Sequence, residues 1–253
     1  EFPVVEFTLD GRPVQALRGE TILQAAQRVG ADIPHLCYQE GMRPDGNCRA
    51  CVVEIAGERV LAPSCCRTVA PGMEVQAHSE RARKSQQMVL ELLLADLPQQ
   101  GHKWNDAGGS RPDPRAGQHG ELSAWADRLQ VTPRPQLKAL QRPPVATDAS
   151  HPAMMVNLES CIQCTRCVRA CREEQVNDVI GYALRGSTAK IVFDLDDPMG
   201  ESTCVACGEC VQACPTGALM PARGAALPVP DKQVDSVCPY CGVGCQLTYN
   251  VKD

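Results

Sequence analysis

The two stretches that decide the fold are CIQCTRCVRACREEQ, residues 161–175, and CVACGECVQACPTGAL, residues 204–219. Both place four cysteines in the order Cys-x2-Cys-x2-Cys-x3-Cys. Three thiolates at this spacing can surround one four-iron cluster in a tight turn, and the fourth ligand then comes from elsewhere. The duplication therefore predicts two [4Fe-4S] clusters in one unit, residues 153–224, in which each half completes the other.

This spacing resembles that of bacterial two-cluster ferredoxins, in which the fourth cysteine of each run ligates the other cluster. The resemblance implies one cluster held by Cys161, Cys164, Cys167 and Cys214, and a second held by Cys204, Cys207, Cys210 and Cys171. Pro215 completes the Cys-Pro ending of the second run, whereas Arg172 stands at the equivalent place in the first. Two zinc sites or buried free thiols are the alternatives, but zinc usually takes paired Cys-x2-Cys units.

The composition favours small domains assembled around inserted groups. The chain has 253 residues and sixteen cysteines, with only 4% aromatic residues, and its net charge of -5 argues against nucleic acid as a partner. No secretory pattern opens the sequence, so cluster ligation in a reducing cytoplasm is favoured over disulfides. The longest apolar run, residues 88–97, contains Glu91 and Asp96 and is too short to span a bilayer, so we expect no membrane span.

The first 78 residues predict a small α+β domain. Apolar and polar residues alternate over 4–18 around Asp10-Gly11-Arg12, which is typical of a β-hairpin. A helix is expected from the N-cap Thr21 to Gly30, and a second hairpin is expected after Cys51 with its turn at 56–58. Residues 73–78 can close the sheet, which gives a β-grasp arrangement.

This region carries a third cysteine set, Cys37-x10-Cys48-x2-Cys51-x13-Cys65. It resembles the [2Fe-2S] ferredoxin-like domain of the large complex I electron-transfer subunit, of iron-only hydrogenases and of NAD-dependent formate dehydrogenases. Cys65 and Cys66 compete for the fourth ligand position, and the resemblance of the preceding Ala-Pro-Ser favours Cys65. The small residues Gly46 and Ala50 leave room for backbone amides near the cluster.

Residues 79–152 are expected to form one helix followed by a Gly- and Pro-rich linker. The helix covers 81–97, ends at Pro98, and has an apolar face made of Met88, Val89, Leu92, Leu93 and Leu97. A short helix is possible at 121–130, and the linker is expected to lie on a partner or on the neighbouring domains.

The relatives named above usually carry a cluster held by one histidine and three cysteines just after this helix. With Pro98 aligned to the proline of that motif, its ligand positions are occupied here by Leu97, Gly101, Trp104 and Ser110. We therefore expect this cluster to be absent. His102 and His119 lie nearby, but they lack cysteine partners and are expected to be solvated.

The last motif, Cys238-Pro-Tyr-Cys241-Gly-Val-Gly-Cys245, opens a further region, residues 225–253. It resembles the first line of molybdenum or tungsten bis-pterin oxidoreductases, especially formate dehydrogenases, in which a downstream cysteine completes a third [4Fe-4S] cluster. Gly242 and Gly244 allow the backbone to wrap closely. Half of a zinc ribbon is the alternative.

Three arginines, Arg166, Arg169 and Arg172, stand among the ligands of the first cubane. A positive charge near a cluster favours its reduced state. For any one of these arginines, however, a solvated position on a helix face is the expectation, because arginine is seldom buried.

The resemblance covers nearly the whole chain and is to the N-terminal part of the α subunit of a soluble NAD-dependent formate dehydrogenase. It implies that formate is oxidised at a downstream Mo/W bis-pterin site and that electrons pass through the clusters to a partner subunit that holds flavin and iron–sulfur clusters and reduces NAD. This part of the chain is then expected to hold no catalytic residue, to belong to a cytoplasmic hetero-oligomer, and to conduct electrons. Two alternatives stay open: a subunit of a complex I or bidirectional hydrogenase assembly, and a free-standing polyferredoxin.

Overall fold

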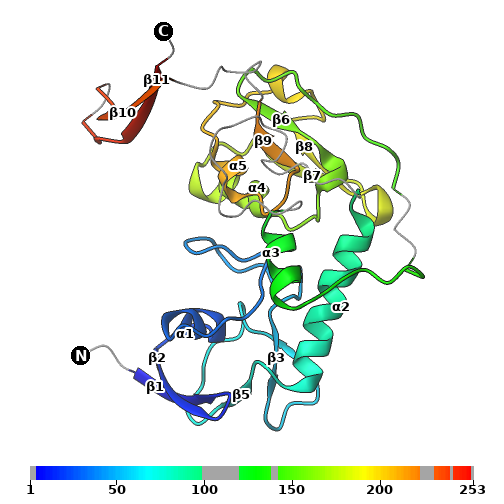
Figure 1. Ribbon diagram of the computed structural model, residues 1–253, viewed down its shortest axis with the longest axis vertical. Coiled ribbons are helices and arrows are strands. Elements are labelled where there is room, and N and C mark those ends of the chain that lie inside the picture. Colours follow the sequence, from blue (N-terminus) through cyan, green and yellow to red (C-terminus); the bar gives the residue numbers. More distant parts are fainter. Residues whose placement is uncertain (1–3, 99–119, 138–141, 223–230, 240–241, 252–253) are drawn as a thin grey trace.

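The computed structural model describes residues 4–98, 120–137, 142–222, 231–239 and 242–251. Figure 1 shows the N-terminal region, residues 4–78, and the cysteine-rich region, residues 142–222, at opposite ends of the molecule. The helices α2 and α3 lie between them, and the β10–β11 hairpin projects away from the rest (Figure 1).

The described strands are β1 Val4–Leu9, β2 Arg12–Leu17, β3 Val52–Ile55, β4 Ala62–Pro63, β5 Glu74–Gln76, β6 Met154–Val156, β7 Ile180–Ala183, β8 Lys190–Phe193, β9 Leu219–Pro221, β10 Lys232–Val237 and β11 Gln246–Val251. The described α-helices are α1 Ile22–Arg28, α2 Glu80–Asp96, α3 Glu121–Arg128, α4 Arg166–Arg169 and α5 Glu209–Ala213. The π-helical turn η2, Ala170–Glu174, continues α4, and short 3-10 turns lie at η1 Leu158–Ser160, η3 Gly186–Thr188 and η4 Met199–Glu201.

The N-terminal region is a five-stranded sheet with the order β2-β1-β5-β3-β4. The hairpin between β1 and β2 is confirmed, and its two turn residues, Asp10 and Gly11, have positive φ values of 50° and 77°, as a two-residue hairpin turn requires. β5 pairs in parallel with β1 and antiparallel with β3. This central position of the last strand is the β-grasp arrangement expected from the sequence.

The helix α1 covers the sheet through an apolar face. Thr21 caps it with a complete capping box: its side chain accepts from the Gln24 N–H, and the Gln24 side chain accepts from the Thr21 N–H at 2.9 Å. Ile22, Leu23, Ala25 and Ala26 are fully buried against the sheet. The expected helix and both of its ends are confirmed.

The expected helix after the sheet is confirmed as α2, but the apolar face predicted for it is partly wrong. Met88 and Leu92 are 45% and 52% exposed, whereas Leu90 is fully buried. The buried face also carries a polar residue, Gln86, whose amide donates to the carbonyls of Val52 at 2.9 Å and Ala77 at 3.1 Å. The spacing of apolar residues alone cannot locate the buried face of α2, because that face includes a polar side chain that donates to buried backbone carbonyls.

The cysteine-rich region has small two-stranded sheets on its outside and the two helices α4 and α5 inside. β6 pairs with β9 and β7 with β8, both antiparallel. The interior is made of aliphatic side chains, Phe193 and cysteines, among them Cys167, Cys171, Cys210 and Cys214. The large share of cysteine in this cluster agrees with the low aromatic content of the chain.

The described part of the linker lies on its neighbours, as expected. α3 packs on α2 through Leu122, which is fully buried with Leu90 and Leu97. Beyond α3, Arg134 lies against α2 and forms a two-pronged ion pair with Glu91, with Nε to Oε1 at 2.7 Å and Nη2 to Oε2 at 3.0 Å. The Arg134 N–H donates to the same carboxylate at 2.9 Å.

None of the helices in the described ranges has the length and apolar character that a membrane crossing requires. The C-terminal hairpin pairs β10 with β11 over its full length, from Lys232 opposite Val251 to Val237 opposite Gln246. Cys238 and Cys245 therefore lie next to the paired ends of β10 and β11.

We expect Gln86→Leu to lower the free energy of unfolding by about 1–3 kcal/mol, because two buried carbonyls lose their donor. Chemical denaturation of the cluster-loaded chain measures this change. Lys84→Leu is the matched control, since Lys84 is exposed on the same helix. An equal effect of both substitutions would show that the bonds of Gln86 do not stabilise the packing of α2 on the sheet.

The ion pair between Glu91 and Arg134 should make stability depend on pH only in acid. Hydrogen bonds from Arg134 lower the pKa of Glu91 below its value in an unfolded chain. The stability that the pair contributes is therefore present above the unfolded pKa, about 4.3, and is lost as the pH falls through the lower folded pKa. In a double-mutant cycle with Glu91→Gln and Arg134→Gln, the coupling energy should be constant at neutral pH and should vanish only in that acidic range. A coupling that declines already above about pH 5 would contradict it.

Candidate functional site

The four cysteines of the N-terminal set come together at the end of the sheet that faces the cysteine-rich region. Cys37, Cys51 and Cys65 are buried and Cys48 is half-buried. The backbone N–H of Cys37 points to the Cys48 sulfur and the N–H of Cys48 points to the Cys37 sulfur, both at 3.4 Å. Backbone donors aimed at sulfur are what a thiolate-bound cluster needs, because they stabilise its negative charge.

These thiols are close enough to control each other's protonation. Hydrogen bonds from Cys48 and Cys65 hold the pKa of Cys37 well below its ordinary value, and the hydrogen bond from Cys65 lowers the pKa of Cys51 to about 7. The same contacts raise the pKa values of Cys48 and Cys65. Four thiolates can therefore coexist here only if bound metal supplies positive charge.

The structure separates Cys65 from Cys66. The side chain of Cys65 lies among the other thiols and is buried, whereas Cys66 is exposed, with its sulfur 3.6 Å from that of Cys65. Gly46, at φ +64°, faces Cys66, and a Cβ atom at Gly46 would lie 2.9 Å from the Cys66 sulfur. The small residue at position 46 thus makes room for Cys66, which differs from the role expected from the sequence.

The two cysteine runs of the cysteine-rich region have the same backbone course. The N–H of Gln163 donates to the Cys161 sulfur and the N–H of Ala206 donates to the Cys204 sulfur, both at 3.4 Å. The residues two and four positions after the first cysteine all have positive φ: Gln163 at 55°, Thr165 at 61°, Ala206 at 59° and Gly208 at 76°. Three of these four are not glycine, so the loops hold a strained conformation that turns amides toward sulfur.

The structure gives partial information on how the thiols of this region are grouped, and the ligand assignment stays a prediction. All four cysteines assigned to the second cluster line one small cavity, together with apolar side chains: Cys171, Cys204, Cys207 and Cys210. Burial raises the pKa of Cys161 to about 11 and the pKa of Cys164 to about 12, and the negative charge of Cys214 adds to the rise in both. Cys171 therefore lines the cavity of the second run, and Cys214 lies near Cys161 and Cys164.

Within the described ranges, no three His, Cys, Asp or Glu side chains converge on a point that would hold a single metal ion. A cubane spreads its four ligands over four iron atoms, so its cysteines surround a volume and do not meet at one point. The cavity bounded by four sulfurs has this form.

Buried polar atoms without partners provide an independent test of fit. In the part of the chain that the structure describes, four buried side-chain atoms have no hydrogen-bond partner, and all four are donors: Ser64 Oγ, Arg142 Nε, Ser160 Oγ and Arg169 Nε. Ser64 precedes Cys65, Ser160 precedes Cys161, and both arginines donate to carbonyls of cluster cysteines. Orphaned buried donors are rare, and here they adjoin the predicted ligands, where cluster sulfur can accept their hydrogen bonds.

Sequence analysis did not identify Ser64, Arg142 or Ser160 as part of the site, and it named Arg169 only as a charge among the ligands of the first cubane. The sequence did carry a signal for the two serines, because Ser64 directly precedes Cys65 and Ser160 directly precedes Cys161. Arg142 lies in the linker, and its donation to the Cys161 carbonyl at 2.9 Å depends on the tertiary fold.

The expectation that the arginines of the first run are solvated is wrong for two of the three. Arg166 and Arg169 are each 3% exposed, and both reach across to the N-terminal region. Arg166 donates to the Leu36 carbonyl at 3.1 Å, and Arg169 donates to the Cys37 carbonyl at 2.5 Å. Arg172 is exposed and pairs with Asp178 at the surface.

Further contacts join the same two loops. The Asn47 amide donates to the Gln163 carbonyl at 2.8 Å, and the Thr165 hydroxyl donates to Asp45 at 2.6 Å. Ile162 packs in the same apolar cluster as Cys48. The loop that contains Cys161, Cys164 and Cys167 is therefore the one that abuts the N-terminal cysteine set.

The remaining sequence predictions fall at the edges of the described structure. Cys238 is half-buried, Cys245 is exposed, and the Cys238 N–H donates to the Cys245 carbonyl at 2.8 Å, while Cys241 lies outside the described residues. Leu97, at the histidine position of the motif judged lost, is buried in the apolar cluster with Leu90. The other positions of that motif, Gly101, Trp104 and Ser110, and the two histidines, His102 and His119, lie outside the described residues.

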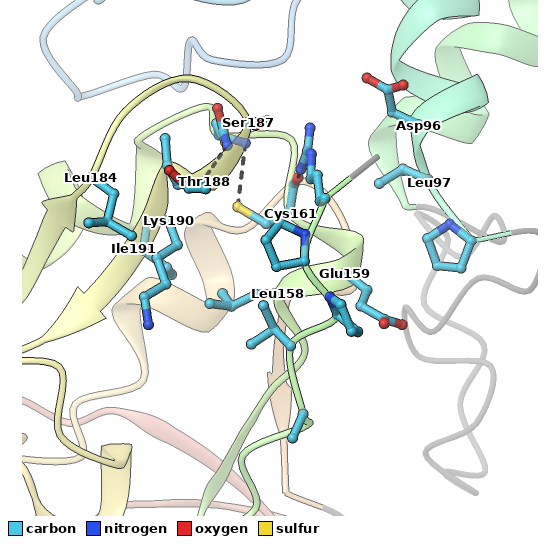
Figure 2. Close-up of a pocket in the computed structure, with 18 residues that line it drawn as sticks. Asp96, Leu97, Leu158, Glu159, Cys161, Leu184, Ser187, Thr188, Lys190 and Ile191 are labelled. Carbon is cyan, nitrogen blue, oxygen red and sulfur yellow. Dashed lines mark hydrogen bonds between the residues drawn. The ribbon is translucent and has the colours of Figure 1, made fainter. Parts of the chain in front are cut away.

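A larger cavity of about 660 Å³ lies beside the first cysteine run (Figure 2). In Figure 2, Leu97 and Asp96 at the end of α2 lie on one side of Cys161, and Thr188 and Lys190 lie on the other. The cavity therefore lies between the end of α2 and Cys161, the predicted first ligand of the first cubane.

Comparison with known families identifies three domains. Residues 3–80 match the 2Fe-2S iron-sulfur cluster binding domain, residues 160–218 match the 4Fe-4S dicluster domain, and residues 231–253 match the molybdopterin oxidoreductase Fe4S4 domain. The chain is thus a [2Fe-2S] ferredoxin domain followed by a dicluster domain and the start of a molybdopterin oxidoreductase Fe4S4 domain. The fold class and the cofactor classes expected from the sequence are confirmed.

Several relatives share this arrangement. The chain is 32% identical to the G 2 subunit of the NADH-quinone oxidoreductase of Rhizobium meliloti, over 98% of the chain and 28% of that protein. It is 33% identical to the HndD subunit of the NADP-reducing hydrogenase of Solidesulfovibrio fructosivorans, over 86% of the chain and 36% of that protein. It therefore spans about a third of the length of these relatives.

A solved structure, that of an NAD+-reducing [NiFe]-hydrogenase in the H2-reduced state, superposes with a TM-score of 0.72 and 29% identity, over 89% of this chain and 91% of that chain. The chain carries iron–sulfur domains of the kind found in the G-type subunits of NADH-quinone oxidoreductases and in NAD(P)-linked hydrogenase subunits.

We expect Cys65→Ala to abolish the [2Fe-2S] electron paramagnetic resonance signal and Cys66→Ala to preserve it, because only Cys65 lies among the other three thiols. Spectra of the reduced chain, with iron and sulfide counted, measure this. The adjacent cysteine serves as the control. A signal that survives in Cys65→Ala and disappears in Cys66→Ala would reverse the assignment.

Proposed function

We propose that this chain conducts electrons, with Cys37, Cys48, Cys51 and Cys65 as ligands of a [2Fe-2S] cluster and the two cysteine runs as ligands of two [4Fe-4S] clusters. The supporting observation is the direct contact between cluster loops: the Arg169 guanidinium donates to the Cys37 carbonyl at 2.5 Å and to the Cys164 carbonyl at 3.3 Å. One side chain therefore joins a ligand of the [2Fe-2S] cluster to a ligand of the first cubane.

When bound, an iron–sulfur cluster accepts and releases one electron at a time. The residues of the chain set the distance between clusters, exclude water and adjust the electrostatics around them. The loop contact between Asn47 and Gln163 helps to set the distance, and the buried contact between Arg166 and Leu36 also excludes water. The donors Ser64, Ser160 and Arg142 perform the third.

The same contacts support an order of the centres. The [2Fe-2S] site adjoins the cubane of Cys161, Cys164, Cys167 and Cys214. The cubane of Cys204, Cys207, Cys210 and Cys171 comes next, and the exposure of Cys207 favours a position at the surface. Electrons then pass between the N-terminal region and that outer surface through the first cubane.

We propose further that the complete protein is the α subunit of an NAD-dependent formate dehydrogenase. The match of residues 231–253 to the molybdopterin oxidoreductase Fe4S4 domain supports this, because that description is the one expected for the start of a Mo/W bis-pterin oxidoreductase. In this proposal Cys238, Cys241 and Cys245 begin a third [4Fe-4S] site. A cytoplasmic hetero-oligomer with a flavin- and iron–sulfur-containing subunit that reduces NAD completes the assembly.

A second candidate is a subunit of an NADH-quinone oxidoreductase or of a hydrogenase assembly. The names of the relatives favour it, since one relative belongs to an NADH-quinone oxidoreductase and another to an NADP-reducing hydrogenase. A free-standing polyferredoxin is the third candidate, and its distinguishing property is that it needs no further subunit.

We expect the anaerobically prepared chain to contain iron and acid-labile sulfide for one [2Fe-2S] and two [4Fe-4S] clusters, with matching resonance signals on reduction. Stoichiometric zinc in place of iron, or freely titratable thiols in a colourless preparation, would refute cluster binding. Cys207→Ala should remove only the outer cubane signal, which checks the ligand assignment.

For the complete protein, we expect bound molybdenum or tungsten and formate-dependent reduction of NAD. Metal analysis and three activity assays distinguish the candidates. The assays measure reduction of NAD by formate, reduction of a quinone by NADH, and oxidation of hydrogen. Activity with quinone or hydrogen and none with formate would favour the second candidate and would leave electron conduction by this chain intact.

A further inference from the structure

Arg169 is a buried cation that no described carboxylate neutralises. Its residue exposure is 3%, and its guanidinium donates to three backbone carbonyls, those of Arg43 at 2.6 Å, Cys37 at 2.5 Å and Cys164 at 3.3 Å. Its Nε atom is buried and has no partner among the described residues. Carbonyl dipoles satisfy its N–H groups only in part and leave its full charge uncompensated.

The neighbouring Arg166 provides the contrast. It is equally buried, but it forms a two-pronged ion pair with Glu121, with Nη1 to Oε2 at 2.7 Å and Nη2 to Oε1 at 3.1 Å. Arg43, at the same interface, pairs with Glu173 and has a side chain that is 63% exposed. Of these three arginines, Arg169 alone is both buried and without a described acidic partner.

A buried charge without a counter-charge is strongly unfavourable, so such a residue indicates that negative charge is present nearby in the working protein. The nearest candidates are the two thiolate-held clusters on either side of it. A cluster with four thiolates is anionic, and it becomes more anionic by one charge when it takes up an electron.

We propose that Arg169 is a shared positioning residue of the [2Fe-2S] cluster and the first cubane: its guanidinium fixes the two ligand loops to each other and raises the reduction potential of both clusters. The inference rests on the proposed function, because it requires both clusters. The electron that one cluster gains is the electron that its reduced neighbour loses. No bond is made or broken.

The test is a redox titration of the cluster-loaded chain, followed by electron paramagnetic resonance, in wild type, Arg169→Gln, Arg169→Lys and Arg43→Gln. We expect Arg169→Gln to shift the potentials of both clusters to more negative values. A tenfold fall in the ratio of reduced to oxidised cluster at a fixed applied potential corresponds to about 59 mV for a one-electron couple. Arg169→Lys keeps the charge and should restore both potentials, and Arg43→Gln should leave them unchanged because its charge is screened by solvent.

The possible outcomes distinguish a failure of the proposed function from a failure of the role of Arg169. Absence of clusters from the wild-type chain would refute the proposed function itself. Intact clusters whose potentials do not move in Arg169→Gln, or that move equally in Arg169→Lys, would overturn only the role of Arg169. Arg169→Gln could fail to hold its clusters, and Arg169→Lys then decides the question. If Arg169→Lys keeps both clusters with unchanged potentials, the role of the charge is supported. If Arg169→Lys loses the clusters too, that role is overturned.

Discussion

The arrangement of this molecule depends on two buried guanidinium groups that cross from one cysteine loop to another. Arg166 and Arg169 begin on α4, inside the first cysteine run, and end on backbone carbonyls of the loop that holds Cys37. Arginine suits this position because it stays charged and presents several donors in a fixed plane. Because the Arg169 guanidinium binds a carbonyl of each loop, at Cys37 and at Cys164, the loops cannot separate without exposing buried acceptors.

The helix α3 strengthens this junction from the side. Its first N–H donates to the Pro215 carbonyl at 2.9 Å, and the carboxylate of the same residue, Glu121, holds Arg166. A residue of the linker therefore joins the second cysteine run to the first and, through Arg166, to the N-terminal region. The linker thus contributes to the geometry of the site and is more than a tether.

The sequence predicted the parts of this protein that depend on local spacing. The hairpin at Asp10-Gly11 and the capped helix after Thr21 each follow from a pattern within a few residues, and the classes of cluster follow from the spacing of the cysteines. The sequence could not predict which residues would be buried by docking. Arg169 in isolation is a surface-type residue, and only the approach of the Cys37 loop buries it. The polar face of α2 at Gln86 was missed for the same reason, because its acceptors lie on β3 and near β5.

The positive φ angles in the two cysteine loops identify residues whose backbone conformation is strained. Gln163, Thr165 and Ala206 occupy a region that side chains with a Cβ disfavour, at a cost of about 1–2 kcal/mol each. Packing of the loops and their N–H contacts to sulfur offset this cost.

The two cysteine loops differ in their access to solvent. The Cys207 side chain is exposed, and Val205, beside it, is 64% exposed, whereas the Cys37 and Cys164 thiols are buried between docked loops. A redox partner or dioxygen can therefore reach the Cys207 thiol without any opening motion of the described residues, whereas the Cys37 and Cys164 thiols are shielded from both.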